Sequence, residues 1–333
     1  MLIARDKATL ARRAVEADWS IYLGAEAARM RMSEWIEPTF AQTFAAELTN
    51  AYRLCTYDDG WAELYGADIL ISYKTAAAQE RLTSELRLWA LAANVRFERI
   101  FTRFLPKQNA QRQSPHLFEG SDSSPLHIAV RERGLCYGVD FGSGYSAGLF
   151  LDQRHNRSFV RQLGAKTLLN CFAYTCSFSV VAAAAGGKTL NVDISKKSLT
   201  RGRKNFALNG LPLTGHRFID EDVMEYLPRL ARKGEKFDVI ILDPPTFSRS
   251  KIGKAFQVER DFETLLLAAL ELTERESRIL LSTNCGTLNK HALAVMARFA
   301  LKASRRSGTL HQEAPLPDFP AGAGASTLWL SLQ

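Results

Sequence analysis

The chain has 333 residues and a formal net charge of +8, from 43 Lys and Arg against 35 Asp and Glu. This length predicts about two domains, and the mild basic excess is compatible with a polyanionic partner without requiring one. Five cysteines without CxxC spacing and six histidines without ligand spacing argue against a disulfide framework and against a metal site. No apolar run is long enough to cross a membrane and no secretory signal is present, so we expect a cytoplasmic protein.

The first 125 residues predict two small units. Residues 1–48 carry apolar residues at helical spacing among many Ala, Arg and Glu, and they predict two or three amphipathic helices. Residues 49–125 predict a small α+β domain. Its expected elements are a hairpin at 61–66 and 68–73, a helix at 75–94 and a strand at 96–104. Residues 106–125 are polar and rich in Ser, so we expect a linker or mobile loop there.

Residues 126–333 predict an α/β domain with a doubly wound sheet, because strands and helices alternate from residue 166 to the end. After a hairpin at 126–131 and 135–141, the expected strands are 167–170, 189–192, 217–219, 239–242, 278–283 and 327–331, with one more beyond residue 307. Four successive strands end in polar or acidic residues. Since ligands of such sheets bind at the carboxyl ends of the strands, this edge is the predicted site.

The strand, turn and helix around residues 170–179 are typical of a site for an adenosine-bearing cofactor. Asp193 ends the next strand 23 positions after Asn170, near the spacing expected of a carboxylate that binds a ribose. The glycines that let a backbone approach a pyrophosphate are absent, and Phe172 and Tyr174 stand in the turn. S-adenosylmethionine, which has no phosphates, therefore fits better than a dinucleotide. The alternative role for Asp193 is to cap the following helix.

An apolar strand runs directly into Asp243-Pro244-Pro245-Thr246-Phe247. Neither proline can donate a ladder hydrogen bond, so the strand ends there and holds Asp243 at its carboxyl end. We expect Asp243, Pro244 and Pro245 to form a catalytic lip, with Phe247 stacking on a flipped base. The alternative is a capping aspartate followed by a structural turn.

Three further features have a functional and a structural interpretation. Cys285 follows the fifth strand, where a thiolate would add to C6 of cytosine, but a buried inert cysteine is the alternative. Residues 150–157, with Gln153 and Arg154, are expected to fold over the cofactor or to contact phosphates, and a capped surface helix start is the alternative. The G-x-S-x-G pattern at 144–148 is that of a hydrolase nucleophile, but the strand and helix that this motif needs do not flank it.

Together these segments resemble the class I S-adenosylmethionine-dependent methyltransferases of the 23S ribosomal RNA type. The motifs, which follow one another in the family's order, lie at 150–157, 169–175, 192–195, 205–210 and 243–248. The resemblance spans roughly residues 127–290 and implies a seven-stranded Rossmann-like domain. It also implies a cofactor site made by Gln153, Arg154, Asn170, Phe172, Tyr174, Thr175, Asp193, Ile194, Asp222 and Asp243. In that site Asp193 would hold the ribose, Asp222 would lie by the adenine and Asp243 would face the methyl transfer.

Three departures from the family leave the target open. Cys176 stands where the family turn has Gly, and no RNA-binding domain of the PUA type is recognisable in residues 1–48. Residues 243–251 resemble the guanine-N7 branch of the family, while Cys285 is similar to the cysteine of the cytosine-5 branch. We expect an enzyme that methylates a base of 23S ribosomal RNA. The alternatives are a methyltransferase for protein or a small molecule, and a non-catalytic RNA-binding protein that retains the fold.

Overall fold

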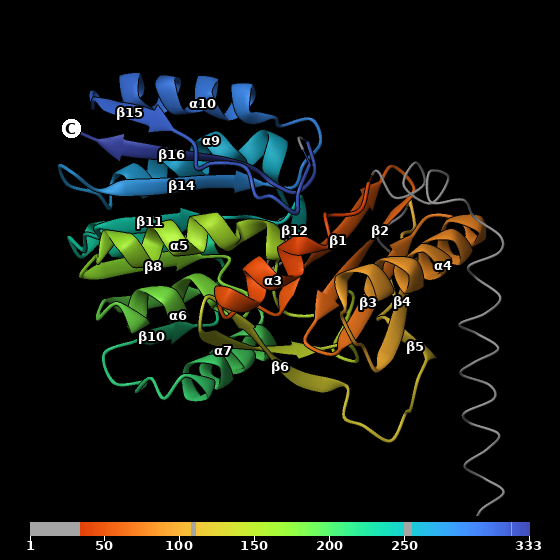
Figure 1. Ribbon diagram of the computed structural model, residues 1–333. Coiled ribbons are helices and arrows are strands. Elements are labelled where there is room, and N and C mark those ends of the chain that lie inside the picture. The colour runs from red at the N-terminus through yellow and green to blue at the C-terminus, as the bar shows by residue number, and fades with distance from the viewer. Residues whose placement is uncertain (1–33, 108–110, 250–254, 321) are drawn as a thin grey trace, which may run out of the picture.

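The computed structural model describes residues 34–107, 111–249, 255–320 and 322–333, which form two units side by side (Figure 1). The smaller unit contains a five-stranded sheet, and the larger one a seven-stranded sheet. The helices predicted before residue 34 lie outside the described residues. Within the described residues, no helix combines the length and the apolar character needed to cross a bilayer.

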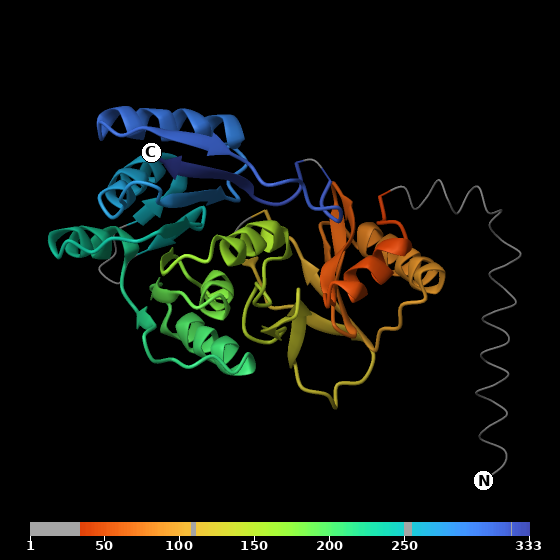
Figure 2. The same ribbon diagram turned by 60° about the vertical axis from the view of Figure 1, so that its left-hand side comes forward.

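The smaller unit is a sheet covered on one side by two helices. Its elements are α3 (Thr39–Ala46), β1 (Ala51–Tyr57), β2 (Gly60–Tyr65), β3 (Asp68–Tyr73), α4 (Ala76–Ala93), β4 (Arg99–Phe104) and β5 (His116–Glu119). The strands pair in the order β1-β2-β3-β4-β5, and only β3 and β4 are parallel. Figure 2 shows α3 and α4 on the face that is turned away from the larger unit.

The predicted hairpin and helix of this unit are confirmed. The Thr75 side chain accepts the Ala78 N–H at 3.1 Å and starts α4, and Asn94 ends it in the left-handed conformation. Trp35 and Phe44 pack in one core with residues of α4 and the sheet, so α3 is part of this unit. The prediction of a linker or mobile loop at 106–125 is wrong for β5, whose mostly exposed side chains show no apolar alternation.

The larger unit begins with a two-stranded ribbon and continues as an α/β sandwich. Its elements are β6 (His127–Glu132), β7 (Leu135–Asp140), η2 (Leu151–Gln153), α5 (Arg154–Leu163), β8 (Thr167–Cys171), α6 (Ser177–Ala184), β9 (Lys188–Val192), α7 (Lys196–Leu208), β10 (Arg217–Ile219), α8 (Val223–Arg232), β11 (Val239–Leu242), β12 (Phe247–Arg249), β13 (Ala255–Gln257), α9 (Val258–Leu270), β14 (Arg278–Thr283), α10 (Lys290–Ala303), β15 (Gly308–His311) and β16 (Ser326–Leu332).

The strand order of the large sheet is β10-β9-β8-β11-β14-β16-β15, which confirms the predicted seven-stranded doubly wound sheet. The five strands from β10 to β14 are parallel, whereas β16 is antiparallel to both of its neighbours. The chain first builds outward from β8 to β10 and then outward in the other direction from β11. The switch point therefore lies between β8 and β11, where sheets of this type bind their ligands.

Successive residues of the central strands face opposite layers of helices. Leu169 belongs to the core under α8, α9 and α10, while Leu168 belongs to the core under α5 and α6. The asparagines of the predicted motif at 205–210 have a structural role at the edge of α7. Asn205 accepts the Gly138 N–H, and Asn209 both accepts from and donates to the backbone of Cys136. They attach α7 to β7.

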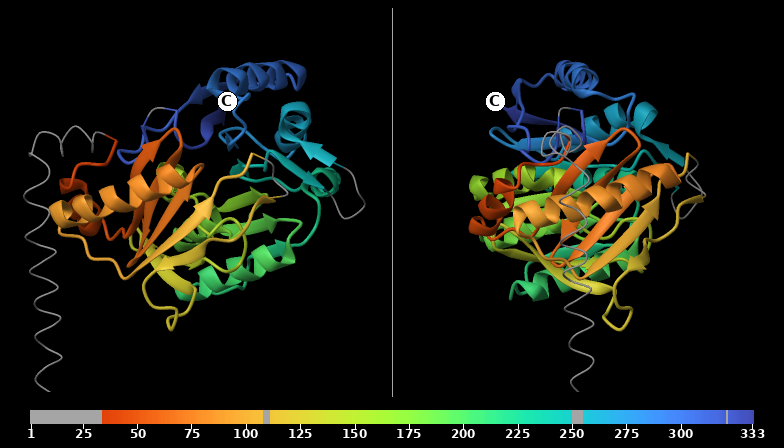
Figure 3. Two further views of the ribbon diagram at one scale, coloured as in Figure 1. Left: turned by 90° about the vertical axis from the view of Figure 1, so that its right-hand side faces the viewer. Right: turned by 45° about the vertical axis from the view of Figure 1, so that its right-hand side comes forward.

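The two units share a core and a set of buried charges. Phe101 of β4 stacks on Phe141 of the larger unit with 4.2 Å between ring centroids, and both rings are fully buried. The loop between β15 and β16 reaches the small sheet, as Figure 3 shows. There the Asp318 carboxylate accepts the backbone N–H of Arg53 at 3.0 Å. The two sheets are thus held in a defined relative position.

Candidate active site

A cavity of about 270 Å³ opens at the carboxyl ends of β8, β9 and β11, next to the switch point. Its wall includes most of the predicted site residues. These are Gln153, Asn170, Phe172, Tyr174, Asp193, Ile194, Asp222, Asp243, Pro244 and Pro245. The predicted Arg154, Thr175, Phe247 and Cys285 are not among the lining residues. The wall also contains Ser146, Phe150, Arg157, Phe178 and Asn284, whose individual roles the sequence did not indicate.

The turn after β8 holds an unusual backbone. Phe172, Tyr174 and Cys176 all have positive φ, at 56°, 47° and 59°, although each carries a side chain. Such a conformation costs about 1 kcal/mol or more per residue, and clusters of it are typical of functional sites. Positive φ at residues 172, 174 and 176 alternates with ordinary φ at residues 173 and 175 in the turn that joins β8 to α6. Two of the three residues, Phe172 and Tyr174, line the cavity.

Cys176 is compatible with the position where the family has glycine. Its side chain is fully buried and does not line the cavity, so it does not reduce the space for a ligand. It packs against Gly202 of α7, where an added Cβ would lie only 2.4 Å from the Cys176 Sγ. Gly202 therefore provides the room that the Cys176 side chain occupies.

Asp193 is held at the end of β9 by two backbone donors. Its Oδ2 accepts the Tyr174 N–H at 2.8 Å and its Oδ1 accepts the Ser195 N–H at 2.7 Å. Burial raises the pKa of Asp193, and these two hydrogen bonds act in the opposite direction. The helix cap proposed as its alternative role is made by Ser195, whose Oγ accepts from Ser198. Each carboxylate oxygen keeps a lone pair for a ligand hydroxyl.

The cavity suits a cationic, adenosine-bearing ligand. Asp193, Asp222 and Asp243 line it, whereas the charge of Arg157, which also lines it, is paired with Glu132. S-adenosylmethionine carries a sulfonium and an ammonium group against one carboxylate, so the acidic lining favours it. Asp222 caps α8 by accepting the Met224 N–H at 2.8 Å. It therefore has a structural role whether or not it also contacts the adenine.

Asp243 lies at the end of β11 beside a chain of side-chain hydrogen bonds. Gln153 Nε2 donates to Ser282 Oγ at 2.9 Å, and Ser282 in turn hydrogen-bonds Asp243. Burial raises the pKa of Asp243 from 3.8 to about 6, and the bond from Ser282 reduces that shift. At neutral pH most of this carboxylate is ionised and able to accept a hydrogen bond from a substrate N–H group.

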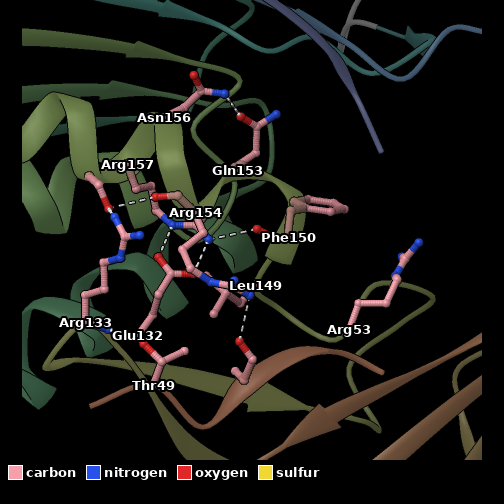
Figure 4. A network of polar contacts seen from close by, with 12 residues as sticks. Thr49, Arg53, Glu132, Arg133, Leu149, Phe150, Gln153, Arg154, Asn156 and Arg157 are labelled. Atoms are coloured by element: carbon pink, nitrogen blue, oxygen red, sulfur yellow. Dashed lines mark hydrogen bonds and ion pairs between the residues drawn. The ribbon is translucent and has the colours of Figure 1, made fainter. Parts of the chain in front are cut away.

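Figure 4 shows the buried network that occupies the segment predicted to cover the cofactor. Arg157 donates to both carboxylate oxygens of Glu132 and, at 2.9 Å, to the carbonyl of Phe150. The Arg154 guanidinium points away from the cavity and binds Asp318 at 2.8 Å. The predicted cofactor role of Arg154 is thus not supported by its position, since α5 turns its side chain toward the smaller unit.

Three other predicted residues lie outside the cavity wall. Thr175 is buried and donates from Oγ1 to the Gly148 carbonyl at 2.6 Å, so it supports the turn from behind. Phe247 is partly exposed on β12. The thiol of Cys285 lies 3.4 Å from Glu259 Oε1 and 3.1 Å from Thr287 Oγ1. Asn284, one position earlier, lines the cavity instead.

Metal ligands are not gathered at this site. Among the residues that the structure describes, no group of three or more His, Cys, Asp or Glu side chains is placed to hold a metal ion.

Known proteins similar to this chain point to one family. The sequence model of the S-adenosylmethionine-dependent methyltransferases matches residues 65–329. Ribosomal RNA large subunit methyltransferase I of Aeromonas salmonicida is 32% identical over 284 residues, which are 81% of this chain and 70% of that protein. A Bacillus subtilis protein named as a candidate ribosomal RNA large subunit methyltransferase is 37% identical over 57% of this chain. That alignment spans about half, 49%, of the Bacillus protein.

The solved structures that are similar to this chain include methyltransferases. A crystal structure of a candidate methyltransferase complexed with SAH has a TM-score of 0.75 at 25% identity, covering 88% of this chain and 78% of that one. The S-adenosylmethionine-dependent methyltransferase from Agrobacterium tumefaciens has a TM-score of 0.66 at 20% identity, covering 85% of this chain and 90% of that one. The second likeness concerns the fold alone.

Proposed function

This chain belongs to the S-adenosylmethionine-dependent methyltransferase family, and we propose that it methylates a base in ribosomal RNA of the large subunit. The observation that carries this proposal is the position of Asp243 and its Pro-Pro turn in the same cavity wall as Asp193. A carboxylate beside a flat, rigid apolar surface suits a planar substrate that carries N–H groups. Ribosomal RNA as the substrate would place this enzyme in the cytoplasm.

The cofactor would lie between the turn after β8 and the ends of β9 and β10. Asp193 would accept the ribose hydroxyls, while Phe172, Ile194 and Val223 would supply apolar contacts. When bound, S-adenosylmethionine supplies an electrophilic methyl group. The contribution of the protein is to exclude water and to orient the acceptor atom, which is catalysis by positioning.

The acceptor atom that fits this site best is a ring nitrogen. Methylation of cytosine at C5 needs a nucleophile that adds to C6. Among the described residues, no cysteine lines this cavity or a second cavity that adjoins it between the two units. A ring nitrogen such as guanine N7 has its own lone pair and needs no covalent activation. Asp243 would hold the base by accepting a hydrogen bond from an N–H group on its edge.

Phe150 replaces Phe247 as the proposed partner of the base. Its ring is 42% exposed and belongs to the cavity wall, and its carbonyl is held by Arg157. It also lies against Tyr174, with ring centroids 5.5 Å apart. An exposed aromatic ring on a rigid support is suited to stacking on a base that has left its helix.

Methyl transfer from labelled S-adenosylmethionine to undermodified large-subunit ribosomal RNA tests this function. We expect label in the RNA, with nuclease mapping and mass spectrometry locating it on one purine. Label in a protein or small-molecule fraction, with none in RNA, would show that the substrate is a protein or a small molecule. Cofactor binding without transfer to any of these fractions would favour a non-catalytic RNA-binding protein.

A further inference from the structure

A second cavity, of about 580 Å³, lies between the two units beside the proposed cofactor site. The small sheet contributes Arg53, Trp61 and Arg103 to its wall, the connection between β4 and β5 contributes Arg112, and the loop between β7 and η2 of the larger unit contributes Tyr145. Phe319, from the loop between β15 and β16, closes another side. The larger unit therefore provides only part of this cavity, and the small unit is needed to complete it.

The two cavities meet at a common wall. Phe150, Pro244, Pro245, Asn284 and Ser146 line both of them. A molecule in the second cavity would consequently reach the catalytic lip from the side opposite to Asp193. This is the arrangement that transfer of a group between two separately bound molecules requires, because the donor and the acceptor approach each other across the shared wall.

The wall of the second cavity combines arginines of the small unit with aromatic rings from both units. The guanidinium carbons of Arg103 and Arg112 each lie 4.8 Å from the centre of the Tyr145 ring. Arg103 is buried and fixes this segment by donating to the Tyr145 carbonyl at 2.8 Å. Arg53 lies over Trp61 and Phe319, at 4.9 and 4.3 Å, and forms an ion pair with Glu63.

Arg112 differs from the other two arginines in its charge balance. It is exposed, and among the described residues it has no ion pair or hydrogen-bond partner. The carboxylates of this cavity are already engaged, since Glu63 pairs with Arg53 and Asp152 accepts the Ala325 N–H. A free guanidinium beside an aromatic ring matches two features of single-stranded RNA: a backbone phosphate and an unstacked base.

We propose that the second cavity receives an unpaired segment of the acceptor RNA, with a base on Tyr145 and a backbone phosphate on Arg112. This inference rests on the proposed RNA substrate. A cavity of this volume admits an unpaired nucleotide and not a double helix, so the target has to leave its helix before it reaches Asp243. The small unit thus acts as one wall of the substrate site.

Binding of a short, fluorescein-labelled single-stranded RNA to the full chain tests the inference without requiring methyl transfer. For Arg112→Gln we expect about tenfold weaker RNA binding, because the variant loses one charged contact with the RNA. The slope of log affinity against log salt concentration should decrease by about the contribution of one phosphate contact. Tyr145→Leu should also weaken binding, with the salt slope unchanged. Arg298→Gln is the matched control, because it removes one exposed arginine of α10 that lines neither cavity.

With ribosomal RNA as substrate, Arg112→Gln should raise KM about tenfold and leave both kcat and the affinity for S-adenosylmethionine nearly unchanged. Equal RNA binding by wild type, Arg112→Gln and Tyr145→Leu would overturn the inference. A loss no larger than that of Arg298→Gln would do the same. If wild type binds single-stranded RNA through Arg112 but transfers no methyl group to ribosomal RNA, the proposed function fails while the inference stands.

Discussion

Asp318 accepts hydrogen bonds from both terminal nitrogens of Arg154, at 3.0 and 2.8 Å, although 164 residues separate them. Both side chains are almost completely buried. The same carboxylate accepts the Arg53 N–H, and Arg154 also donates to the Ala51 carbonyl at 3.3 Å. One buried ion pair therefore joins α5, β1 of the small unit and the loop before β16.

Arg154→Ala should destabilise the protein by about 3–5 kcal/mol, because it leaves the Asp318 carboxylate buried without its cation. Urea unfolding followed by circular dichroism measures this change. Arg217→Ala is the control, since it removes an exposed ion pair with Glu235 and should cost less than about 1 kcal/mol. If Arg154→Ala had normal stability but no longer bound the cofactor, Arg154 would instead be a cofactor-binding residue.

Asp193→Ala should weaken binding of S-adenosylmethionine by about a hundredfold or more, because the variant loses the ribose acceptor and releases the Tyr174 N–H. Isothermal titration calorimetry gives the affinity. Asp122→Ala, in an exposed loop of the chain, is a charge-matched control that should bind as wild type does. Undiminished binding by Asp193→Ala would contradict the assignment of this cavity to the cofactor.

The rate of methyl transfer should fall in acid as Asp243 becomes protonated. With a pKa of about 6, roughly nine-tenths of this carboxylate is ionised at pH 7 and roughly a tenth at pH 5. We therefore expect kcat to drop nearly tenfold between these two pH values. Asp243→Asn should be slow at both values and should show no acid limb.

A stability measurement separates this effect from acid unfolding. Since the pKa of Asp243 is higher in the folded state than in the unfolded chain, its contribution to stability is full below about pH 4 and is lost as the pH rises through 6. Asp243→Asn should therefore stabilise the protein relative to wild type at pH 8 but not at pH 4. A wild-type rate that is independent of pH from 5 to 8 would exclude a role for the carboxylate.

Cys285→Ser should retain full activity, because the Cys285 thiol lies among Glu259 and Thr287 outside both cavities. Asn284→Ala, one position away, should reduce activity at least tenfold by altering the wall that the cofactor and the acceptor share. Methyl transfer assays on ribosomal RNA compare the two variants. Trapping on RNA containing 5-fluorocytidine that disappears in Cys285→Ser would instead establish the covalent cytosine route.

The sequence by itself was sufficient for the sheet and for the residues attached to strand ends. Apolar runs that stop at Asn170, Asp193 and Asp243 predict buried parallel strands, and parallel strands bring their carboxyl ends to one edge. All three residues line the cavity. Thr75 and Asn94 likewise predict both ends of α4, since caps are local interactions.

Only the tertiary structure decided which side chains point into the site, because direction at a strand end or a helix start depends on packing far along the chain. Asn284 rather than Cys285 faces the cavity, and Arg154 turns to Asp318, a partner 164 positions away. The second cavity could not be predicted at all, since its walls come from Trp61, Tyr145 and Phe319 on three separate segments. Local patterns carry no information about contacts made when distant segments pack together.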